Sequence, residues 1–450
     1  MPFSFSRKEL FALIWPLFIE QLLVITLGFA DIVMVASLGD TAVSGVSIVD
    51  SINVLVTGLL GAMAAGGAVV CGHYFGSRNA KMVSLTAKQL IYSCIGISLI
   101  IMIAGLILQK HLLYAVFGNV EADVMHNAYK YFLWTLLSYP FIALYSACAA
   151  IFRSQGNSAI SMLISLLINV LNIGGNAICI YVLKMGTEGV AIPTLISRSI
   201  AAAIVLFLLY NSHEYNGKPA INIKGILKIK LDFKIIKNIL GIGIPNGIEN
   251  SMFQVGKILI LTLMAGFGTG AIAANAAAGT ITTFAVLPGS AMGIALLTVV
   301  SQCLGAGKRD EAVYFTRRLI MICYAAMAII NILFFIFTEQ IVGIFKLGTE
   351  AENLAVSFIR FHSVCAIFIW IVSFTLPNAL RAAGDAKFTM IVSLSSMWIV
   401  RMGLSYVFAY KTDFGAIGIW YAMVIDWIVR SVFFIVRWHQ GKWKTRQFLD

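Results

Sequence analysis

The sequence predicts an all-α integral membrane protein with twelve transmembrane helices in two six-helix bundles. Of its 450 residues, 60% are apolar and 12% are charged, whereas soluble domains carry about 25% charged residues. Twelve apolar runs of about 20 residues or more show no period-2 alternation, which favours helices over a β-barrel. The two halves of the chain are also copies of one another, and this predicts two bundles of equal size.

The first half, residues 1–211, forms the predicted N-lobe. Each of its six apolar runs is long enough to cross about 30 Å of hydrocarbon at about 1.5 Å per residue. Pro16 lies in the first run, and its missing amide hydrogen predicts a bend in that helix. The six runs are 11–36, 46–75, 86–109, 127–152, 158–183 and 187–211.

The second half begins after a polar stretch, 212–235, which contains five lysines and is the predicted cytoplasmic linker. Residues 236–450 then form the predicted C-lobe. Its six apolar runs are 236–266, 271–305, 312–337, 352–380, 387–410 and 415–437.

The internal repeat is visible as identical residues at a constant offset. Each half contains six helices, so both halves begin on the same side of the membrane. The bundles are therefore expected to be related by a pseudo-twofold axis along the membrane normal, a layout typical of transporters. The pairs are Pro16/Pro245, Glu20/Glu249, Gly39/Gly268 and Gly76/Gly305 at an offset of 229, and Arg153/Arg381 and Gly156/Gly384 at 228.

The net charge of +12 does not predict nucleic-acid binding, because the basic residues lie in short segments between apolar runs. In that position they indicate how the protein is oriented in the membrane. With the N-terminus in the cytoplasm, 22 of the 32 Lys and Arg residues fall on the cytoplasmic side and six outside. This bias predicts a multi-pass protein of the cell membrane with both termini in the cytoplasm.

Catalytic motifs are absent from the sequence. There is no H-E-x-x-H and no G-x-S-x-G, and the phosphate-loop ending at Gly305–Lys308 lacks its first glycine, since position 302 is Gln. A membrane enzyme and a receptor-like signalling module are therefore disfavoured. We expect no cofactor and no ATP-driven step, which leaves an ion gradient as the energy source.

Polar residues inside the spans are the candidate functional residues, because each is costly in hydrocarbon unless it is paired or hydrated. Asp31 has no obvious basic partner in the first half except Arg198, which is the alternative to an ion-binding role. Asn169, Asn172 and Asn176 form one stripe on the fifth span. Their amides offer oxygens suited to Na⁺ or to a carboxylic acid, or they join helices by hydrogen bonds. Thr194 adds another oxygen beside Pro193.

Two repeat-related acids follow the two span prolines by one turn. Glu20, with Gln21 beside it, and Glu249, with Asn250 beside it, are candidates for lining a substrate cleft. The alternative is that both carboxylates brace the helix ends near the cytoplasmic interface. The sequence does not choose between these interpretations.

Several motifs together resemble the multidrug and toxin extrusion (MATE) transporters over essentially the whole chain. The resemblance implies a twelve-helix, two-lobe exporter of small organic, often cationic, compounds, driven by inward Na⁺ or H⁺. We expect it to act as a monomer in the bilayer. The alternative is a lipid-linked oligosaccharide flippase of the same superfamily, for which twelve spans are few. The motifs are Trp15-Pro16, Glu20-Gln21, Asp31 to Gly39, Arg153-Ser154-Gln155-Gly156, Arg381-Ala382-Ala383-Gly384 and Gly243-Ile244-Pro245.

The resemblance also implies a site. Asp31 would bind the coupling ion together with Asn172, Asn176 and Thr194. If this ion is a metal, the resemblance implies Na⁺, and no other metal is expected. Many family members have an aspartate at the position of Asn176, so this chain carries one acid there rather than two. An acid found in the second lobe of other members falls at Phe253 and is absent.

Overall fold

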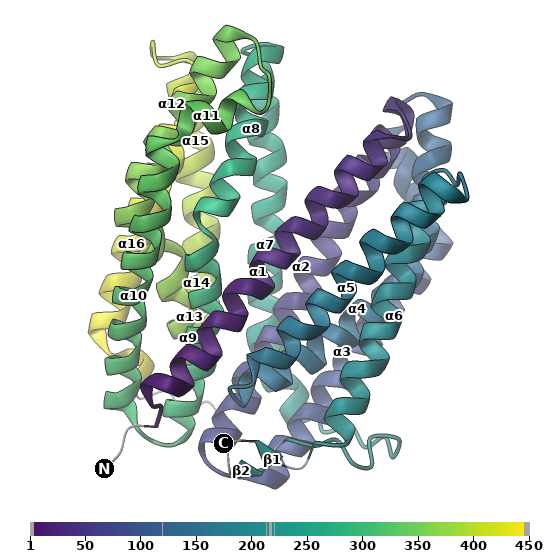
Figure 1. Ribbon diagram of the computed structural model, residues 1–450. Helices are drawn as coiled ribbons and strands as arrows, with labels where there is room; N and C mark the ends of the chain where they lie inside the picture. The colour runs from purple at the N-terminus through teal and green to yellow at the C-terminus, as the bar shows by residue number, and fades with distance from the viewer. Residues whose placement is uncertain (1–3, 119, 213, 216–217, 220, 445–450) are drawn as a thin grey trace. The chain divides into compact units, whose positions relative to one another are not determined.

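The computed structural model describes residues 4–118, 120–212, 214–215, 218–219 and 221–444, and nearly all of them are helical. The first half contains six long helices and a short hairpin (Figure 1). Its elements are α1 (Arg7–Ala36), α2 (Asp40–Gly76), α3 (Ala80–Phe117), α4 (Ala122–Ser154), α5 (Ser158–Ala177), the π-helical segment η1 (Ile178–Val182), α6 (Glu188–Tyr210), β1 (Glu214–Tyr215) and β2 (Lys218–Pro219).

The second half is divided into more helical segments than the first. They are α7 (Phe233–Ala265), α8 (Thr269–Ala285), α9 (Leu287–Gly305), α10 (Arg309–Ile336), α11 (Thr338–Gly343), α12 (Thr349–Cys365), η2 (Ala366–Thr375), α13 (Leu376–Ala382), α14 (Ala386–Ser395), η3 (Ser396–Arg401), α15 (Met402–Tyr410), α16 (Ile417–Gln440) and η4 (Lys442–Lys444). The segments η2 and η3 are π-helical, and η4 is a 3₁₀ turn.

Eleven helices of the described chain are long and apolar enough to cross a membrane. Helix α7 is the twelfth: it has 33 residues, and Glu249, Gln254 and Lys257 lower its mean hydropathy. The predicted all-α membrane class is therefore confirmed. The expected run 271–305 is two helices, α8 and α9, because Pro288 in the first turn of α9 disfavours continuation of the helix before it.

The chain forms two compact units. The N-terminal unit comprises Phe5–Gly247, and the C-terminal unit comprises Ile248 onward with Ser4. The boundary falls inside α7, later than the predicted linker 212–235, because the first half of α7 packs tightly on α2. A Cβ atom on Gly66 would lie 2.7 Å from the backbone nitrogen of Gly243.

The linker itself is bound to the N-terminal unit. The Gln89 side chain on α3 donates to the carbonyl oxygen of Lys230 at 2.7 Å and accepts from the amide of Asp232 at 3.1 Å. Tyr92 donates to the carbonyl oxygen of Ile226. Linker residues 213, 216, 217 and 220 lie outside the described residues.

The repeated glycines occupy turns that require a left-handed backbone. Gly39 and Gly268 precede α2 and α8 with φ of 97° and 90°, and Gly156 and Gly384 have φ of 89° and 80°. L-residues with a side chain rarely adopt this region. The glycine pairs therefore mark the same turns in both halves.

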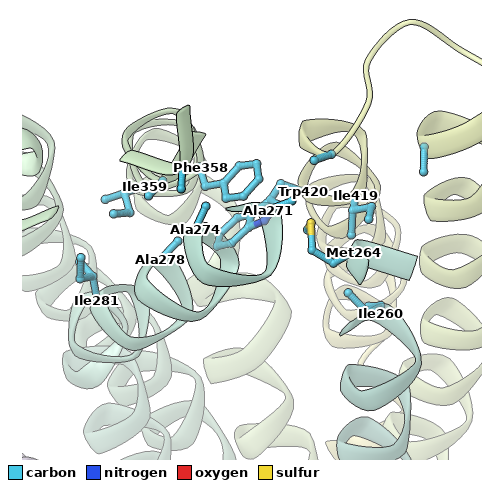
Figure 2. Packing of buried hydrophobic residues seen from close by; sticks show 14 of the residues in the cluster. Ile260, Met264, Ala271, Ala274, Ala278, Ile281, Phe358, Ile359, Ile419 and Trp420 are labelled. Atoms are coloured by element: carbon cyan, nitrogen blue, oxygen red, sulfur yellow. The ribbon is translucent and has the colours of Figure 1, made fainter. Parts of the chain in front are cut away.

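Each unit has its own apolar core. In the C-terminal unit, α7, α8, α12 and α16 pack through residues such as Ile260, Met264, Phe358 and Trp420 (Figure 2). In the N-terminal unit the corresponding cluster includes Val49, Phe132 and Tyr139. These cores fix the helices on which the polar residues described next are carried.

Candidate ion-coupling site

The four predicted site residues form one hydrogen-bonded chain across α1, α5 and α6. The Asn176 side-chain nitrogen donates to Asp31 Oδ1 at 2.7 Å and to Asn172 Oδ1 at 3.0 Å. The Asn172 side chain donates to Thr194 Oγ1 at 2.7 Å, and Thr194 donates to the carbonyl oxygen of Val190 at 2.8 Å. The structure thus brings Asp31, Asn172, Asn176 and Thr194 together.

Local sequence explains this geometry. Asn172 and Asn176 are four residues apart on α5 and therefore lie on one face of the helix. Beside them, a Cβ atom on Gly175 would lie 2.7 Å from the Cβ atom of Pro193, so α5 and α6 approach closely there. This close approach places Thr194 within hydrogen-bond distance of Asn172.

The site retains oxygen atoms that are free to bind a cation. Asn176 is fully buried, and its Oδ1 atom has no hydrogen-bond partner among the described residues. An unpaired buried polar atom is costly in a protein interior and calls for an explanation. Carboxylate and amide oxygens are ligands for hard cations, and an amide oxygen also accepts a hydrogen bond from a protonated carboxyl group. The arrangement can therefore hold Na⁺ or a proton.

The Arg198 guanidinium does not neutralise Asp31 directly. It donates to Ser138 Oγ at 2.7 Å. In the described part of the chain no basic group lies within ion-pair distance of the Asp31 carboxylate. Arg198 and Asp50 still influence Asp31 electrostatically, so Asp31 has charged neighbours of both signs without a fixed counter-ion.

A second network surrounds Asp50. The Asn53 side chain donates to Asp50 Oδ1 at 3.1 Å, and the Tyr131 hydroxyl lies 3.3 Å from the same atom. Tyr139 donates to Asn53 Oδ1 at 2.7 Å. Sequence reasoning did not assign these residues to the site, although the spacing of Asp50 and Asn53 on one helical face was a usable signal.

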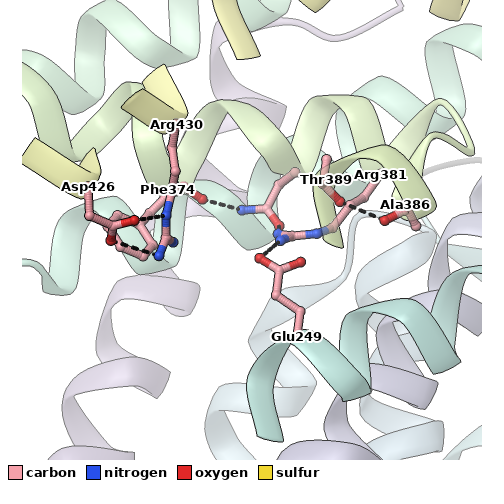
Figure 3. Close-up of polar contacts among 8 residues, drawn as sticks. Glu249, Phe374, Arg381, Ala386, Thr389, Asp426 and Arg430 are labelled. Carbon is pink, nitrogen blue, oxygen red and sulfur yellow. Dashed lines mark hydrogen bonds and ion pairs between the residues drawn. The ribbon is translucent and has the colours of Figure 1, made fainter. Parts of the chain in front are cut away.

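The residues predicted for a substrate cleft lie in different environments. Glu20 accepts from the Arg153 guanidinium and from Ser161 Oγ, both at 2.7 Å. Glu249 accepts from Arg381 at 2.7 Å (Figure 3). Both carboxylates are buried, Gln21 is half-buried and Asn250 is exposed.

These ion pairs join the repeated acid to the repeated arginine within each unit. The pattern was readable in the sequence, because both the acids and the arginines recur at nearly the same offset. The pairs account for the burial of Glu20 and Glu249. Their role in substrate binding stays a prediction.

Among the described residues of the C-terminal unit, the positions that correspond to Asp31 and Thr194 are apolar. Asp31 corresponds to Ile260 at the repeat offset of 229, and Ile260 lies in the apolar core shown in Figure 2. Met423, the counterpart of Thr194, packs against the same core. The side-chain oxygens of Asp31 and Thr194 are thus replaced by hydrocarbon at the corresponding positions of the C-terminal unit.

Twelve apolar helices, duplicated halves and a polar site inside the spans define a multi-pass membrane transporter. The sequence model of the MatE family matches residues 16–178 and 245–407, one match in each half. Both matches begin at the repeated prolines, Pro16 and Pro245. The chain belongs to the MatE family, and it is a membrane transporter rather than an enzyme.

Similar proteins span nearly the whole chain. A probable multidrug resistance protein NorM of Thermotoga maritima is 25% identical over 98% of this chain and 94% of its own length. An uncharacterized transporter of Bacillus subtilis, YisQ, is 28% identical over 97% of this chain and 94% of its own length.

A solved structure shares the fold. It is the outward-facing form of a multidrug resistance MATE family transporter, with a TM-score of 0.88 at 18% identity, and the match covers 98% of this chain and 97% of that one.

Proposed function

We propose that this protein is a cation-coupled antiporter that exports small organic compounds, often cationic ones, by alternating access. The observation that supports this proposal is the chain of hydrogen bonds from Asp31 through Asn176 and Asn172 to Thr194. The chain lies inside membrane-spanning helices, and Asp31 has no permanent counter-ion among the described residues. The names of relatives such as NorM point to efflux of several compounds. The coupling ion is H⁺ or Na⁺, carried as a substrate of the exchange.

The proposed mechanism depends on the contact of α1 with α5 at Asp31 and on the bend of α1 at Pro16. Asp31 lies 15 residues beyond Pro16 on a single helix, Arg7–Ala36. Its carboxylate oxygen accepts the Asn176 hydrogen bond, and a proton or Na⁺ bound at Asp31 would compete with this amide for the same oxygens. When a cation neutralises Asp31, the contact between α1 and α5 changes, and α1 repacks at Pro16. This repacking would release the substrate outside.

Exchange requires that the ion and the substrate favour different conformations. If the ion favours the repacked form of α1, a substrate bound from the cytoplasm must favour the other form and promote ion release. Such coupling is reciprocal by thermodynamic necessity. The protein need not bind both at once.

The test is ethidium efflux from cells that express the protein. Wild-type protein should lower dye accumulation, and collapse of the ion gradient should abolish the effect. Asp31→Asn should remove gradient-driven efflux while membrane expression is unchanged, because an amide does not exchange a proton and binds a cation poorly. Undiminished efflux by Asp31→Asn would contradict the coupling assignment. If the protein is expressed in the membrane and ethidium accumulation does not change, the export proposal is contradicted and the flippase alternative is favoured.

We also propose that the protein acts as a monomer in the cell membrane. The distribution of Lys and Arg favours a cytoplasmic position for both termini. A green fluorescent protein fused to the C-terminus should fluoresce, and alkaline phosphatase fused there should be inactive. The opposite pair of results would reverse the orientation.

A further inference from the structure

Three basic residues from different helices meet inside the C-terminal unit. They are Lys257 on α7, Arg401 at the end of η3, and Arg430 on α16. Lys257 and Arg401 are close enough to act on each other's charge, and Arg401 also interacts electrostatically with Arg430 and Asp426. Asp426 is one acid near these cations, and Glu249 also interacts electrostatically with Arg430.

Arg430 is already neutralised. Its guanidinium donates to both carboxylate oxygens of Asp426, at 2.9 and 2.8 Å, and both side chains are fully buried (Figure 3). The guanidinium also lies 4.3 Å from the ring centre of Phe253 and 5.3 Å from that of Phe374. Asp426 is thereby committed to Arg430, and Glu249 is paired with Arg381. Within the described residues, neither acid forms an ion pair with Lys257 or Arg401.

Lys257 and Arg401 are not paired within the described part of the chain. Neither has an ion-pair partner there, and the Nε atom of Arg401 is buried without a hydrogen-bond acceptor. The Oγ atom of Ser405, one turn further along the same helix, is likewise buried without a partner. Two donors on one helical face therefore lack an acceptor, which is costly in a protein interior.

A side-chain contact joins the two segments that carry Lys257 and Arg401. A Cβ atom on Gly256, next to Lys257, would overlap the Met397 side chain, which lies one turn before Arg401. The Met397 side chain of η3 thus packs against α7 beside Lys257. Arg401 ends a π-helical segment, and such segments are frequent at functional sites.

Lys257 is accessible although α7 is a membrane-spanning helix. A charged side chain at this depth faces protein or a water-filled space rather than lipid. An exposed lysine beside a guanidinium whose Nε atom is buried without an acceptor is the chemistry that binds a carboxylate or a phosphate.

The three cations have no charged counterparts at the corresponding positions of the N-terminal unit. At the repeat offsets Lys257 corresponds to Gly28, Arg401 to Ile173 and Arg430 to Ala201. The N-terminal unit folds with uncharged residues at all three positions. The cations are therefore not required by the fold that the two halves have in common.

We propose that Lys257 and Arg401 form a binding site for an anionic oxygen group, a carboxylate or a phosphate, on the transported compound. The Asp426–Arg430 pair supports this site by fixing α16 and by occupying the nearby carboxylate. The inference rests on the proposed export function and names one class of compound, those that carry an acidic group.

The test compares two dyes that differ by one carboxylate, rhodamine B and rhodamine B ethyl ester. Binding to the purified full-length protein is followed by fluorescence polarisation, with no ion gradient. Wild-type protein should bind the free acid about tenfold more tightly than the ester, as one charge-assisted contact provides. Lys257→Gln should abolish the preference, and Lys257→Arg should retain most of it.

The control is Lys411→Gln, which removes an exposed lysine outside the cluster and should leave the preference intact. Asp31→Asn should also retain it, so a failed ion-coupling assignment and a failed anion site are distinguishable. Equal affinity for both dyes in wild-type protein, or a preference unchanged by Lys257→Gln, would overturn the proposal.

A competition arm distinguishes the source of the anion. If phosphatidylglycerol, but not phosphatidylcholine, displaces rhodamine B from wild-type protein, the group recognised is carried by a lipid. If neither lipid displaces the dye, the site accepts a free organic anion. Arg401→Gln is a second variant and should reduce the same preference if it folds.

Discussion

Asp31 lies at the end of a chain of neutral amides and a hydroxyl rather than beside a second acid. Asn176 contributes two donated hydrogen bonds and one unused oxygen. A single carboxylate among neutral oxygens can bind one monovalent cation without leaving a residual negative charge. The residue at position 176 should therefore set how much positive charge the site carries.

Asn176→Asp tests this directly. A second carboxylate within hydrogen-bond distance of Asp31 should favour binding of a proton or Na⁺, since two adjacent carboxylates repel when both are ionised. The dependence of efflux on pH or on Na⁺ should shift by about tenfold in ion concentration or more. An unchanged dependence in vesicle transport assays would place position 176 outside the site.

The Glu249–Arg381 pair is a structural element by its geometry. Both side chains are largely buried, so removing one partner leaves a buried charge without its counter-ion. Glu249→Gln should reduce the free energy of unfolding by about 3 kcal/mol, measured as a lower melting temperature in detergent.

The matched control for this pair is Glu339→Gln, which breaks the exposed pair with Arg360 and should cost at most about 1 kcal/mol. Equal effects of the two variants would contradict a bracing role for Glu249.

At this scale the sequence predicted which residues lie together where they share a helix face, and their role in ion coupling stays a prediction. The spacing of Asn172 and Asn176 placed them on one face, and family resemblance placed Asp31 and Thr194 beside them. The sequence showed that the acid and the arginine both recur, but it did not predict that Glu20 pairs with Arg153, because residues 133 positions apart are brought together only in the folded unit.

Helix packing in the N-terminal unit depends on glycines with different surroundings. Gly66 on α2 faces the backbone of α7, whereas a Cβ atom added to Gly61 on the same helix would have no other atom within 4 Å. The two positions therefore separate close packing from the general effect of glycine on helix stability.

Gly66→Val should destabilise the protein by about 2 kcal/mol or more, because the added carbons would overlap α7. Gly61→Val provides the control, since valine there enters open space and changes helix propensity equally. The measurement is the melting temperature of purified protein in detergent. A loss of similar size in both variants would show that contact with α7 is not the cause.

The twelve predicted spans correspond to observed helices, but their interruptions were not predicted. Hydropathy reports that a segment is apolar and says little about its hydrogen-bond register. The break between α8 and α9 at Pro288 had a local signal in the proline. The π-helical segments η2 and η3 did not, because an extra residue per turn is selected by packing rather than by composition.

The two units have diverged in charge while keeping the same turns and the same glutamate–arginine pair. The N-terminal unit carries the half-buried acid Asp31 where its counterpart is Ile260, and the C-terminal unit carries Lys257 where its counterpart is Gly28. Duplication thus preserved the scaffold and assigned different polar chemistry to each copy. Ion coupling in this account belongs to the N-terminal unit.

Transport into proteoliposomes under one imposed gradient at a time tests that claim most directly. Wild-type protein should transport ethidium under one of the two gradients, Na⁺ or pH, imposed alone. Asp31→Asn should show no ethidium transport above the level of protein-free liposomes under either gradient. Gradient-driven transport by Asp31→Asn at the wild-type rate would show that the coupling ion binds elsewhere.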